Sequence, residues 1–275
     1  MLADGHNHTS EFSPDAKMTI DELISAARAK NITVAGITEH YELDNPDPED
    51  NIQTYDLDLY DKVFEEWRAK CPADLTLLKG IEFGYQTHTA EEINRIAGEH
   101  DFDTVILSNH LFRGVDVYFS EEAHLVPKKE RHAEYIGVMA EMCEKIDNFT
   151  VAGHFDYISR DRRSSAGDSF VLYEDCPREF DRLFEALISK EKSLEINTRS
   201  ILKMGEKAGS SSVLPDANIL KRYKEMGGYL ISLGSDSHTP DTLGLLFPET
   251  AEYLKSLGFE GAFYFKKKRP VIEPF

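Results

Sequence analysis

Residues 32–40 read Ile-Thr-Val-Ala-Gly-Ile-Thr-Glu-His, a short apolar and β-branched run that ends in a glutamate and a histidine. The pattern returns in residues 104–110, Thr-Val-Ile-Leu-Ser-Asn-His, and in residues 150–154, Thr-Val-Ala-Gly-His. These runs are continuous rather than alternating in polarity, which is typical of strands buried on both faces of a parallel sheet. A histidine after each run therefore places a possible ligand at the carboxyl end of a buried strand.

Strands and helices alternate along the whole chain. Further strands are predicted at residues 2–5, 75–83, 193–197 and 229–234, with a possible eighth at 261–265. Thr19 and Glu22 predict a capped helix start, and Pro177 suits the first turn of a helix over 178–189. Other helices are predicted over residues 90–100, 128–146 and 216–226. This alternation predicts an α/β fold with right-handed crossovers, and seven or eight units favour a closed TIM-like barrel in a single domain, residues 1–275.

Composition and charge exclude several classes of partner. The chain of 275 residues carries 31 Lys plus Arg against 50 Asp plus Glu, a formal net charge of −19. Such a surface repels nucleic acid and anionic membranes, because binding to phosphate backbones depends on basic side chains. The acid-rich residues 41–61 are predicted to form a solvated loop, although they could also select a cationic substrate. The oligomeric state stays open.

Segments that direct export or span membranes are not expected. No apolar run approaches the roughly 20 residues that span a bilayer, and the N-terminal sequence MLADGHNH does not have the pattern of a secretory signal. The three cysteines lie far apart and form no pair motif, which fits a reducing compartment. The expected location is the cytoplasm.

Six of the ten histidines follow predicted strands, together with two carboxylates. The carboxyl ends of parallel barrel strands meet at one rim, so these side chains are expected to converge. The set is His6, His8, His40, Glu82, His110, His154, Asp236 and His238. Each motif alone could be ordinary: a surface histidine pair, a buried salt bridge or a turn cap. The four remaining histidines, His88, His100, His124 and His132, are expected at the surface or behind the ligands.

Convergence of these groups without counter-ions would be strongly unfavourable, because the carboxylates would repel one another. Divalent cations remove this repulsion. Mixed imidazole and carboxylate ligands suit Zn, Fe or Mn better than Mg or Ca, and the choice among the three stays open. The ligands outnumber the four that one tetrahedral zinc takes, which predicts two or three ions.

The order and spacing of these motifs resemble the polymerase-and-histidinol-phosphatase (PHP) family over nearly the whole chain. The resemblance rests on His6-x-His8, Gly-Ile-Thr-Glu-His40, Gly-Ile-Glu82, Ser-Asn-His110, Gly-His154-Phe-Asp, Glu-Ile-Asn197 and Gly-Ser-Asp236-Ser-His238. It implies a distorted (β/α)7 barrel and three metal ions at the carboxyl ends of the strands. The implied first site is His6, His8, Glu82 and Asp236; Glu82 bridges to a second with His110 and His154; a third takes His40, His238 and Asp15. The chain departs from the family at Glu39, where Asp is usual, and at Asp15, which is His in some relatives.

The resemblance also implies a reaction. A metal-bound hydroxide would attack a phosphate monoester, since bound cations lower the pKa of water and neutralise phosphate oxygens. Glu82, Asp236 and His238 are the expected catalytic groups, and Asp236 or a nearby histidine would protonate the leaving group. Arg160 and Arg199 are expected to bind phosphate, since guanidinium groups contact it in bidentate fashion, and Asn197 to bind substrate or orient a ligand.

The chain length favours the monofunctional histidinol-phosphatase branch, with L-histidinol phosphate as the small-molecule substrate. Three alternatives remain at this point. One is a phosphodiester or phosphotyrosine hydrolase of the same family. Another is an amidohydrolase-type deaminase or amidase, which His-x-His suits equally well but which Glu82 and His238 overfill. The last is a non-enzymatic module that keeps its metals.

Overall fold

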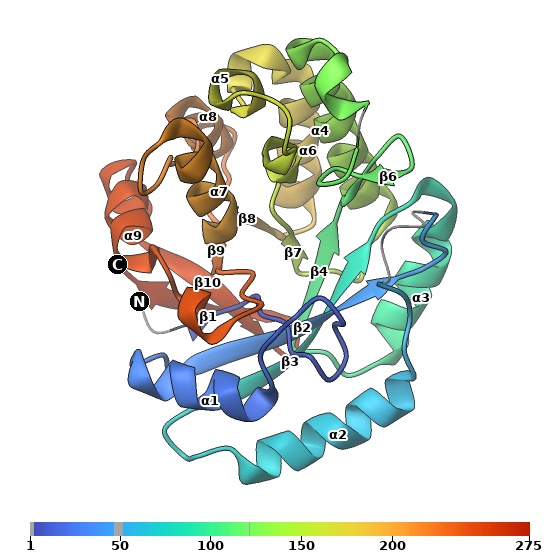
Figure 1. The fold of residues 1–275 in the computed structure, drawn as a ribbon, viewed down its shortest axis with the longest axis vertical. Helices are drawn as coiled ribbons and strands as arrows, with labels where there is room; N and C mark the ends of the chain where they lie inside the picture. The colour runs from blue at the N-terminus through green and yellow to red at the C-terminus, as the bar shows by residue number, and fades with distance from the viewer. Residues whose placement is uncertain (1–2, 47–51, 121) are drawn as a thin grey trace.

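Seven parallel strands form the inner layer of the protein, with helices around them (Figure 1). The computed structural model describes residues 3–46, 52–120 and 122–275. The order of the strands in the sheet is β1 (Ala3–Asp4), β2 (Val34–Glu42), β3 (Thr76–Gly84), β4 (Thr104–Ser108), β7 (Val151–Ala152), β8 (Ser193–Asn197) and β9 (Ile231–Gly234). All seven lie within or overlap the predicted runs; residue 2 of the first run is outside the described residues. The predicted α/β barrel is confirmed.

Hydrogen bonds between the first and last strands close the ring. The Gly5 N–H donates to the Leu233 carbonyl at 3.2 Å, and beyond the strand ends the Asp236 N–H donates to the His6 carbonyl at 2.9 Å. The His8 N–H donates to the Ser237 carbonyl at 3.0 Å. These bonds bring the segments after β1 and β9 side by side, although more than 200 residues separate them in the chain.

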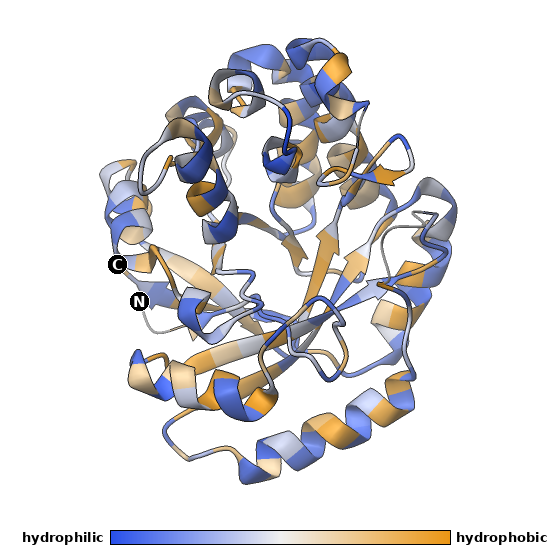
Figure 2. Cartoon of the chain, viewed as in Figure 1, coloured by the Kyte–Doolittle hydropathy of each residue, from blue (hydrophilic) through white to orange (hydrophobic). Residues whose placement is uncertain are grey.

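Helices cover the outside of the barrel. They are α1 (Ile20–Ala29), α2 (Leu57–Lys70), α3 (Ala90–Glu99), α4 (Lys128–Lys145), α5 (Ala166–Ser169), α6 (Pro177–Ser189), α7 (Thr198–Ala208), α8 (Ala217–Glu225) and α9 (Phe247–Ser256). The predicted capping box of Thr19 and Glu22 is present, and Pro177 occupies the first turn of α6. In Figure 2, α2 carries both hydrophobic and hydrophilic residues. It buries Tyr60, Phe64 and Trp67, at intervals of three and four residues, in the hydrophobic core.

Short elements complete the rim loops and connections. They are the strands β5 (Leu111–Phe112) and β6 (Val115–Asp116) and the 3₁₀ turns η1 (Thr87–Thr89), η2 (Ala123–Leu125), η3 (Tyr157–Arg160), η4 (Tyr173–Asp175) and η5 (Pro240–Thr242). Within the described ranges, no helix combines the length and hydrophobicity that crossing a bilayer requires.

Two predictions about loops and strands are wrong in part. The acid-rich segment 41–61 is not all loop, because β2 continues to Glu42 and α2 begins at Leu57; residues 47–51 lie outside the described residues. The possible eighth strand does not join the barrel. Instead β10 (Gly261–Lys266) pairs antiparallel with β11 (Arg269–Pro274).

This hairpin packs against the amino ends of the strands. Phe265 clusters with Ile106 and Val151, and Asp103 holds the turn by accepting the Lys267 N–H at 2.8 Å on its carboxylate. The hairpin therefore covers the end of the barrel opposite the histidines, and the rim at the carboxyl ends is left for the site.

Candidate metal centre

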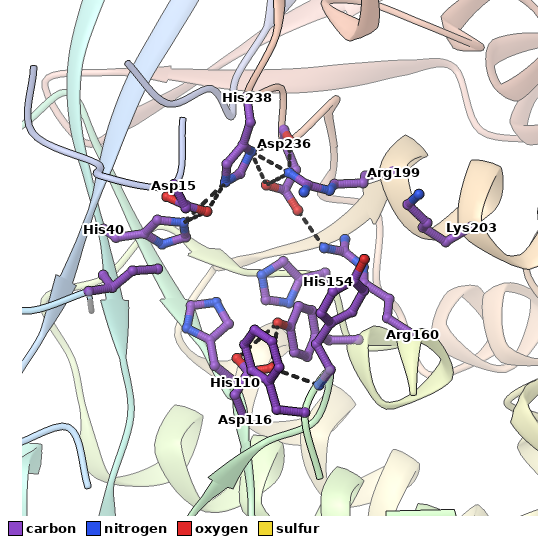
Figure 3. A pocket seen from close by; sticks show the side chains of 14 residues that line it. Asp15, His40, His110, Asp116, His154, Arg160, Arg199, Lys203, Asp236 and His238 are labelled. Carbon is purple, nitrogen blue, oxygen red and sulfur yellow. Dashed lines mark hydrogen bonds and ion pairs between the residues drawn. The ribbon is translucent and has the colours of Figure 1, made fainter. Parts of the chain in front are cut away.

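Eight side chains from the carboxyl ends of six strands and the loops after them gather in one buried cluster. His40 lies in β2 and Glu82 in β3, while the other members follow β1, β4, β7 and β9 directly. The burial is deep: each of the eight is less than one-tenth exposed. The members are His6, His8, His40, Glu82, His110, His154, Asp236 and His238. The sequence-predicted set therefore lies together at one rim of the barrel, as Figure 3 shows for five of its members.

Glu82 is at the centre of the cluster and faces imidazoles with both carboxylate oxygens. Its Oε1 lies 2.8 Å from His154 Nε2 and 3.3 Å from His110 Nε2. The distances from Oε2 are 2.8 Å to His40 Nδ1, 3.3 Å to His6 Nε2 and 3.4 Å to His8 Nε2. One carboxylate thus stands between two groups of imidazoles.

Asp15 reaches the cluster from the loop between β1 and α1. Its Oδ2 lies 2.7 Å from His238 Nε2 and 3.7 Å from His40 Nε2 (Figure 3). The His8 ring stacks on the His40 ring with centroids 3.9 Å apart. Asp15 does not start a helix, because α1 begins only at Ile20.

The geometry of the ligand atoms fits divalent transition-metal ions. Within each of four groups, one ligand atom from every member lies within 4.8 Å of the others: His6, His8 and Glu82; Glu82, His110 and His154; His8, His40 and His238; His40, Glu42 and His110. Glu82 Oε2 and His40 Nδ1 are buried but form no hydrogen bond, although they lie 2.8 Å apart. A cation bound to both atoms would give each of these buried polar groups a partner. Nitrogen and oxygen ligands of this kind suit a divalent transition metal.

The protonation of the cluster shows how strongly its charges interact. Burial raises the pKa of Glu82, but His6, His110 and His40 outweigh burial, so this pKa stands well below its usual range. Burial lowers the pKa of His6, whereas Glu195 and Glu82 raise it well above normal. The carboxylate therefore stays ionised, and His6 holds a proton that a metal would displace.

Arg160 lies beside the cluster, and its guanidinium is fixed by three residues. Its Nη1 donates to Asp236 Oδ2 at 2.7 Å, Nη2 to Asn197 Oδ1 at 2.8 Å, and Nε to Ser200 Oγ at 3.1 Å. These bonds use three of the five N–H groups of the guanidinium. Arg160 also lines the cavity over the cluster, where its other N–H groups can meet a ligand.

Arg199 approaches from the first turn of α7 and is about one-third exposed. Its Nη1 donates to the Asp236 carbonyl at 2.9 Å and contacts His238 Nδ1. Lys203, one turn further along α7, lines the same cavity and pairs with Glu206 at 2.9 Å. Three cationic side chains thus line one side of the cavity (Figure 3).

Asn197 is not among the described residues that line the cavity. Its amide is 2% exposed, accepts from Arg160 and caps α7 by accepting the backbone N–H groups of Arg199 and Ser200. The structure therefore gives Asn197 contacts with protein groups, among them Arg160, and its role in binding substrate or orienting a ligand stays a prediction.

The sequence analysis missed two buried glutamates that hold imidazoles of the cluster. Glu195 Oε1 lies 2.7 Å from His6 Nδ1, and Glu42 Oε1 lies 2.6 Å from His110 Nδ1. Such carboxylates fix the tautomer and orientation of ligating histidines. A charged residue inside an otherwise buried strand was the signal that could have indicated them.

A cavity of about 260 Å³ opens onto the cluster. Another part of its wall is built by the segment after β4, which contributes Asp116, Tyr118 and Phe119, and by Tyr157 of η3, whose ring centroid lies 4.8 Å from the Arg160 guanidinium carbon. The Tyr157 hydroxyl donates to Asp116 Oδ2 at 3.0 Å. None of these residues was predicted, and they give the cavity one cationic side and one side with a carboxylate and aromatic rings.

The prediction for the other histidines is wrong at one position. His88 is exposed and pairs with Asp44, whereas His132 is fully buried in α4. Its Nδ1 lies 3.5 Å from Asp175 Oδ2 of η4, and in the described part of the chain its ring forms no hydrogen bond with the cluster. Arg162 is exposed, and its guanidinium carbon lies 3.7 Å from the centroid of the Tyr118 ring.

Comparison with known sequences gives consistent relatives. Residues 4–199 match the PHP domain family. A probable histidinol-phosphatase of Clostridium acetobutylicum is 31% identical over 267 residues, which cover 97% of this chain and 98% of the relative. A histidinol-phosphatase of Lactococcus lactis subsp. lactis is 27% identical over 93% of this chain and 91% of the relative.

Solved structures agree with this comparison. The crystal structure of the histidinol phosphate phosphatase from L. lactis, complexed with Zn, L-histidinol and phosphate, superposes with a TM-score of 0.84 at 26% identity and covers 98% of both chains. A putative histidinol phosphatase from Listeria monocytogenes shares the fold, with a TM-score of 0.74 at 20% identity over 90% of this chain and 99% of the other.

Proposed function

Because this chain belongs to the PHP domain family, we propose that it is a metal-dependent phosphomonoesterase that hydrolyses L-histidinol phosphate to L-histidinol and phosphate. The observation that carries the proposal is the position of Glu82. Its two oxygens face two groups of imidazoles. The cavity that opens onto these imidazoles is also lined by Arg160 and Arg199. Ligands for cations and donors for a phosphate dianion therefore meet in one small space.

We assign two or three divalent ions to the cluster, chosen from Zn, Fe and Mn. His6, His8, Glu82 and Asp236 would hold the first, and Glu82, His110 and His154 the second. Asp15, His40 and His238 would hold a third, and the stacking of His8 on His40 supports its place beside the first. When bound, such ions supply an activated water at neutral pH and neutralise phosphate oxygens.

The residues around the cluster bind and orient the substrate. Arg160 can offer two N–H groups to phosphate, and Arg199 adds a second guanidinium from the opening of the cavity. Burial raises the pKa of Asp236, but Arg160 and Arg199 hold it well below its usual range. Asp236 is therefore ionised in the resting site, so it would have to accept a proton from the attacking water before it could pass one to the leaving oxygen.

The other side of the cavity suits the organic part of the substrate. Asp116 provides a carboxylate for an ammonium group, and Tyr118 and Phe119 provide rings beside which an imidazole can lie. A cavity of about 260 Å³ fits a small monoester better than a phosphorylated polymer.

The experiment is phosphate release from a panel of esters, with elemental analysis of protein purified without chelator. We expect bound transition metal and a clear preference in kcat/KM for L-histidinol phosphate over p-nitrophenyl phosphate and glycerol phosphate. Asp116→Asn should reduce this preference, because the contact with the ammonium group weakens, and should change turnover of the uncharged esters less. Equal turnover of all esters would refute the substrate, and metal-free inactive protein would refute the hydrolase.

A further inference from the structure

Glu195 of β8 is fully enclosed, with 1% of its surface exposed, and its two oxygens serve different parts of the site. Oε1 accepts from His6 Nδ1 at 2.7 Å. Oε2 accepts the backbone N–H of His154 at 2.6 Å and the Asn197 Nδ2 amide at 3.1 Å. One carboxylate thus joins the segments after β1, β7 and β8.

The Asn197 amide extends this set of bonds to the arginines. Its Nδ2 is held by Glu195, which points Oδ1 the other way, towards Arg160 Nη2 at 2.8 Å and the Arg199 backbone N–H at 3.1 Å. Arg160 then donates to Asp236. A continuous hydrogen-bonded path therefore runs from His6 through Glu195 and Asn197 to Arg160.

The neighbouring strand β9 has a glycine, Gly234, beside this carboxylate, and the missing side chain leaves room for it. A Cβ on Gly234 of β9 would overlap both Glu195 Oε1 and the His6 Cβ. The backbone φ of Gly234 is not positive, so its conformation does not require glycine. Glycine is required here because a larger residue would collide with Glu195 and His6.

Glu42 makes the simpler contact and provides the comparison. Its Oε1 accepts from His110 Nδ1 at 2.6 Å, and Gly84 on the adjacent strand leaves space for its carboxylate. Among the described residues, the Glu42 carboxylate lies close to His40 and His110 and forms no hydrogen bond with an arginine.

We propose that Glu195 is a positioning residue that couples the metal site to the phosphate-binding arginine. By accepting the Nδ1 proton of His6 it leaves Nε2, which lies 3.3 Å from Glu82, as the ring nitrogen that would bind a metal. Through Asn197 it sets the plane of the Arg160 guanidinium. The inference rests on the proposed function, because it takes His6 as a metal ligand and Arg160 as a phosphate contact.

The test compares Glu195→Gln with Glu42→Gln by two measurements that do not depend on turnover. Metal affinity is measured by competition with a chelator, and the dissociation constant of inorganic phosphate by calorimetry on metal-saturated protein. Glutamine retains the size of glutamate but has only one acceptor oxygen, so Glu195→Gln cannot serve His6 and Asn197 together. We expect both variants to lose metal affinity by roughly 10- to 100-fold.

Only Glu195→Gln should also weaken phosphate binding, by about tenfold at saturating metal. Unchanged metal affinity, or phosphate binding within twofold of that of Glu42→Gln, would overturn the proposal. If Glu195→Gln does not fold, the same two measurements on Asn197→Ser test the coupling. Serine still caps α7 but is too short to reach Arg160. It should weaken phosphate binding with wild-type metal content, and unchanged phosphate binding would overturn the coupling.

Failure of the proposed function would be visible earlier. Wild-type protein that holds no metal and releases no phosphate from L-histidinol phosphate would refute both the function and this inference before any variant is compared. Active, metal-loaded wild type with insensitive Glu195 variants would refute this inference alone.

Discussion

Asp236 connects the imidazole cluster with the arginines through its two oxygens. Oδ1 lies 3.4 Å from His8 Nε2, and Oδ2 accepts from Arg160 at 2.7 Å. Its backbone φ of 50° lies in the left-handed region, which costs a non-glycine residue about 1 kcal/mol or more. The hydrogen bond of its N–H to the His6 carbonyl helps to hold this conformation. The strained backbone thus lies at the residue that contacts both the imidazoles and the arginines.

Arg199→Ala tests the phosphate contact at the scale of one residue. The guanidinium is partly exposed at the cavity, so its loss should lower kcat/KM by roughly 10- to 100-fold, as expected for a charged hydrogen bond to phosphate. Metal content should stay at the wild-type level, because Arg199 contributes no ligand atom. Steady-state kinetics and elemental analysis measure the two quantities.

Lys221→Ala is the matched control, since Lys221 is an exposed cation on α8. It should leave both quantities unchanged. Loss of metal from Arg199→Ala would show that the contact with His238 supports a ligand, and the role assigned to Arg199 would then be wrong.

At the scale of elements, a buried arginine ties together two loops near the cavity. Arg131 of α4 donates from Nη1 to the carbonyls of Ala123 and Val126, and from Nη2 to the carbonyl and carboxylate of Asp168. The loop that carries Tyr118 is thereby joined to the loop that contains α5. Arg131 thus holds a loop of the cavity wall in place, although Arg131 itself is not among the residues that line the cavity.

His132, next to Arg131 in α4, leads us to expect that the stability of the protein falls in acid. Burial, followed by the positive charges of Arg131 and Lys128, lowers the pKa of His132 to about 4, with Asp175 opposing them. The unfolded chain binds this proton near pH 6.5, so its contribution to stability is complete above pH 6.5 and is lost as the pH falls towards 4. The loss should approach about 3 kcal/mol.

His132→Leu should remove this component. Urea unfolding at several pH values measures it, and the difference between wild type and variant should change between pH 6.5 and 4. His88→Gln, at an exposed histidine, is measured in parallel as the control for the loss of an imidazole. Parallel curves for wild type and His132→Leu would contradict the prediction.

At the scale of the whole molecule, the two ends of the barrel have different tasks. The β10–β11 hairpin covers one end with apolar side chains, while the other end holds the groups of histidines and glutamates that can bind a metal ion. Because the hydrophobic core surrounds the barrel independently of the site, the fold should persist when the metals are removed.

Chelation should therefore lower thermal stability without abolishing the fold. Metal at 100 times its dissociation constant adds about 2.7 kcal/mol per site, which corresponds to about 5 °C in Tm for a chain of this size. Calorimetry before and after chelation measures the shift, and far-UV circular dichroism should stay unchanged. Restored zinc should recover both Tm and activity; an unchanged Tm would argue against the metal centre.

The affinity for metal should also fall in acid. Burial lowers the pKa of His40, but Asp15 and Glu82 raise it to about 9, and Glu42 and Glu82 raise that of His110 well above normal against the effect of burial. These imidazoles hold protons that the cation must displace, so lower pH favours the metal-free form.

The sequence alone determined the barrel class, most strand and helix positions, and the residues that form the cluster. These follow from local patterns: continuous apolar runs mark buried strands, and a polar residue after each run lies at the same rim whatever the details of packing. The resemblance of the motifs gave the family, which the comparisons confirm.

Only the tertiary structure decided the contacts between side chains from different strands. The pairing of Glu195 with His6, the passage through Asn197 to Arg160, and the place of Asp116 opposite the arginines depend on which strands are neighbours and in which register. The position of the β10–β11 hairpin outside the barrel was equally invisible, because an apolar run records that a segment is buried but not against what.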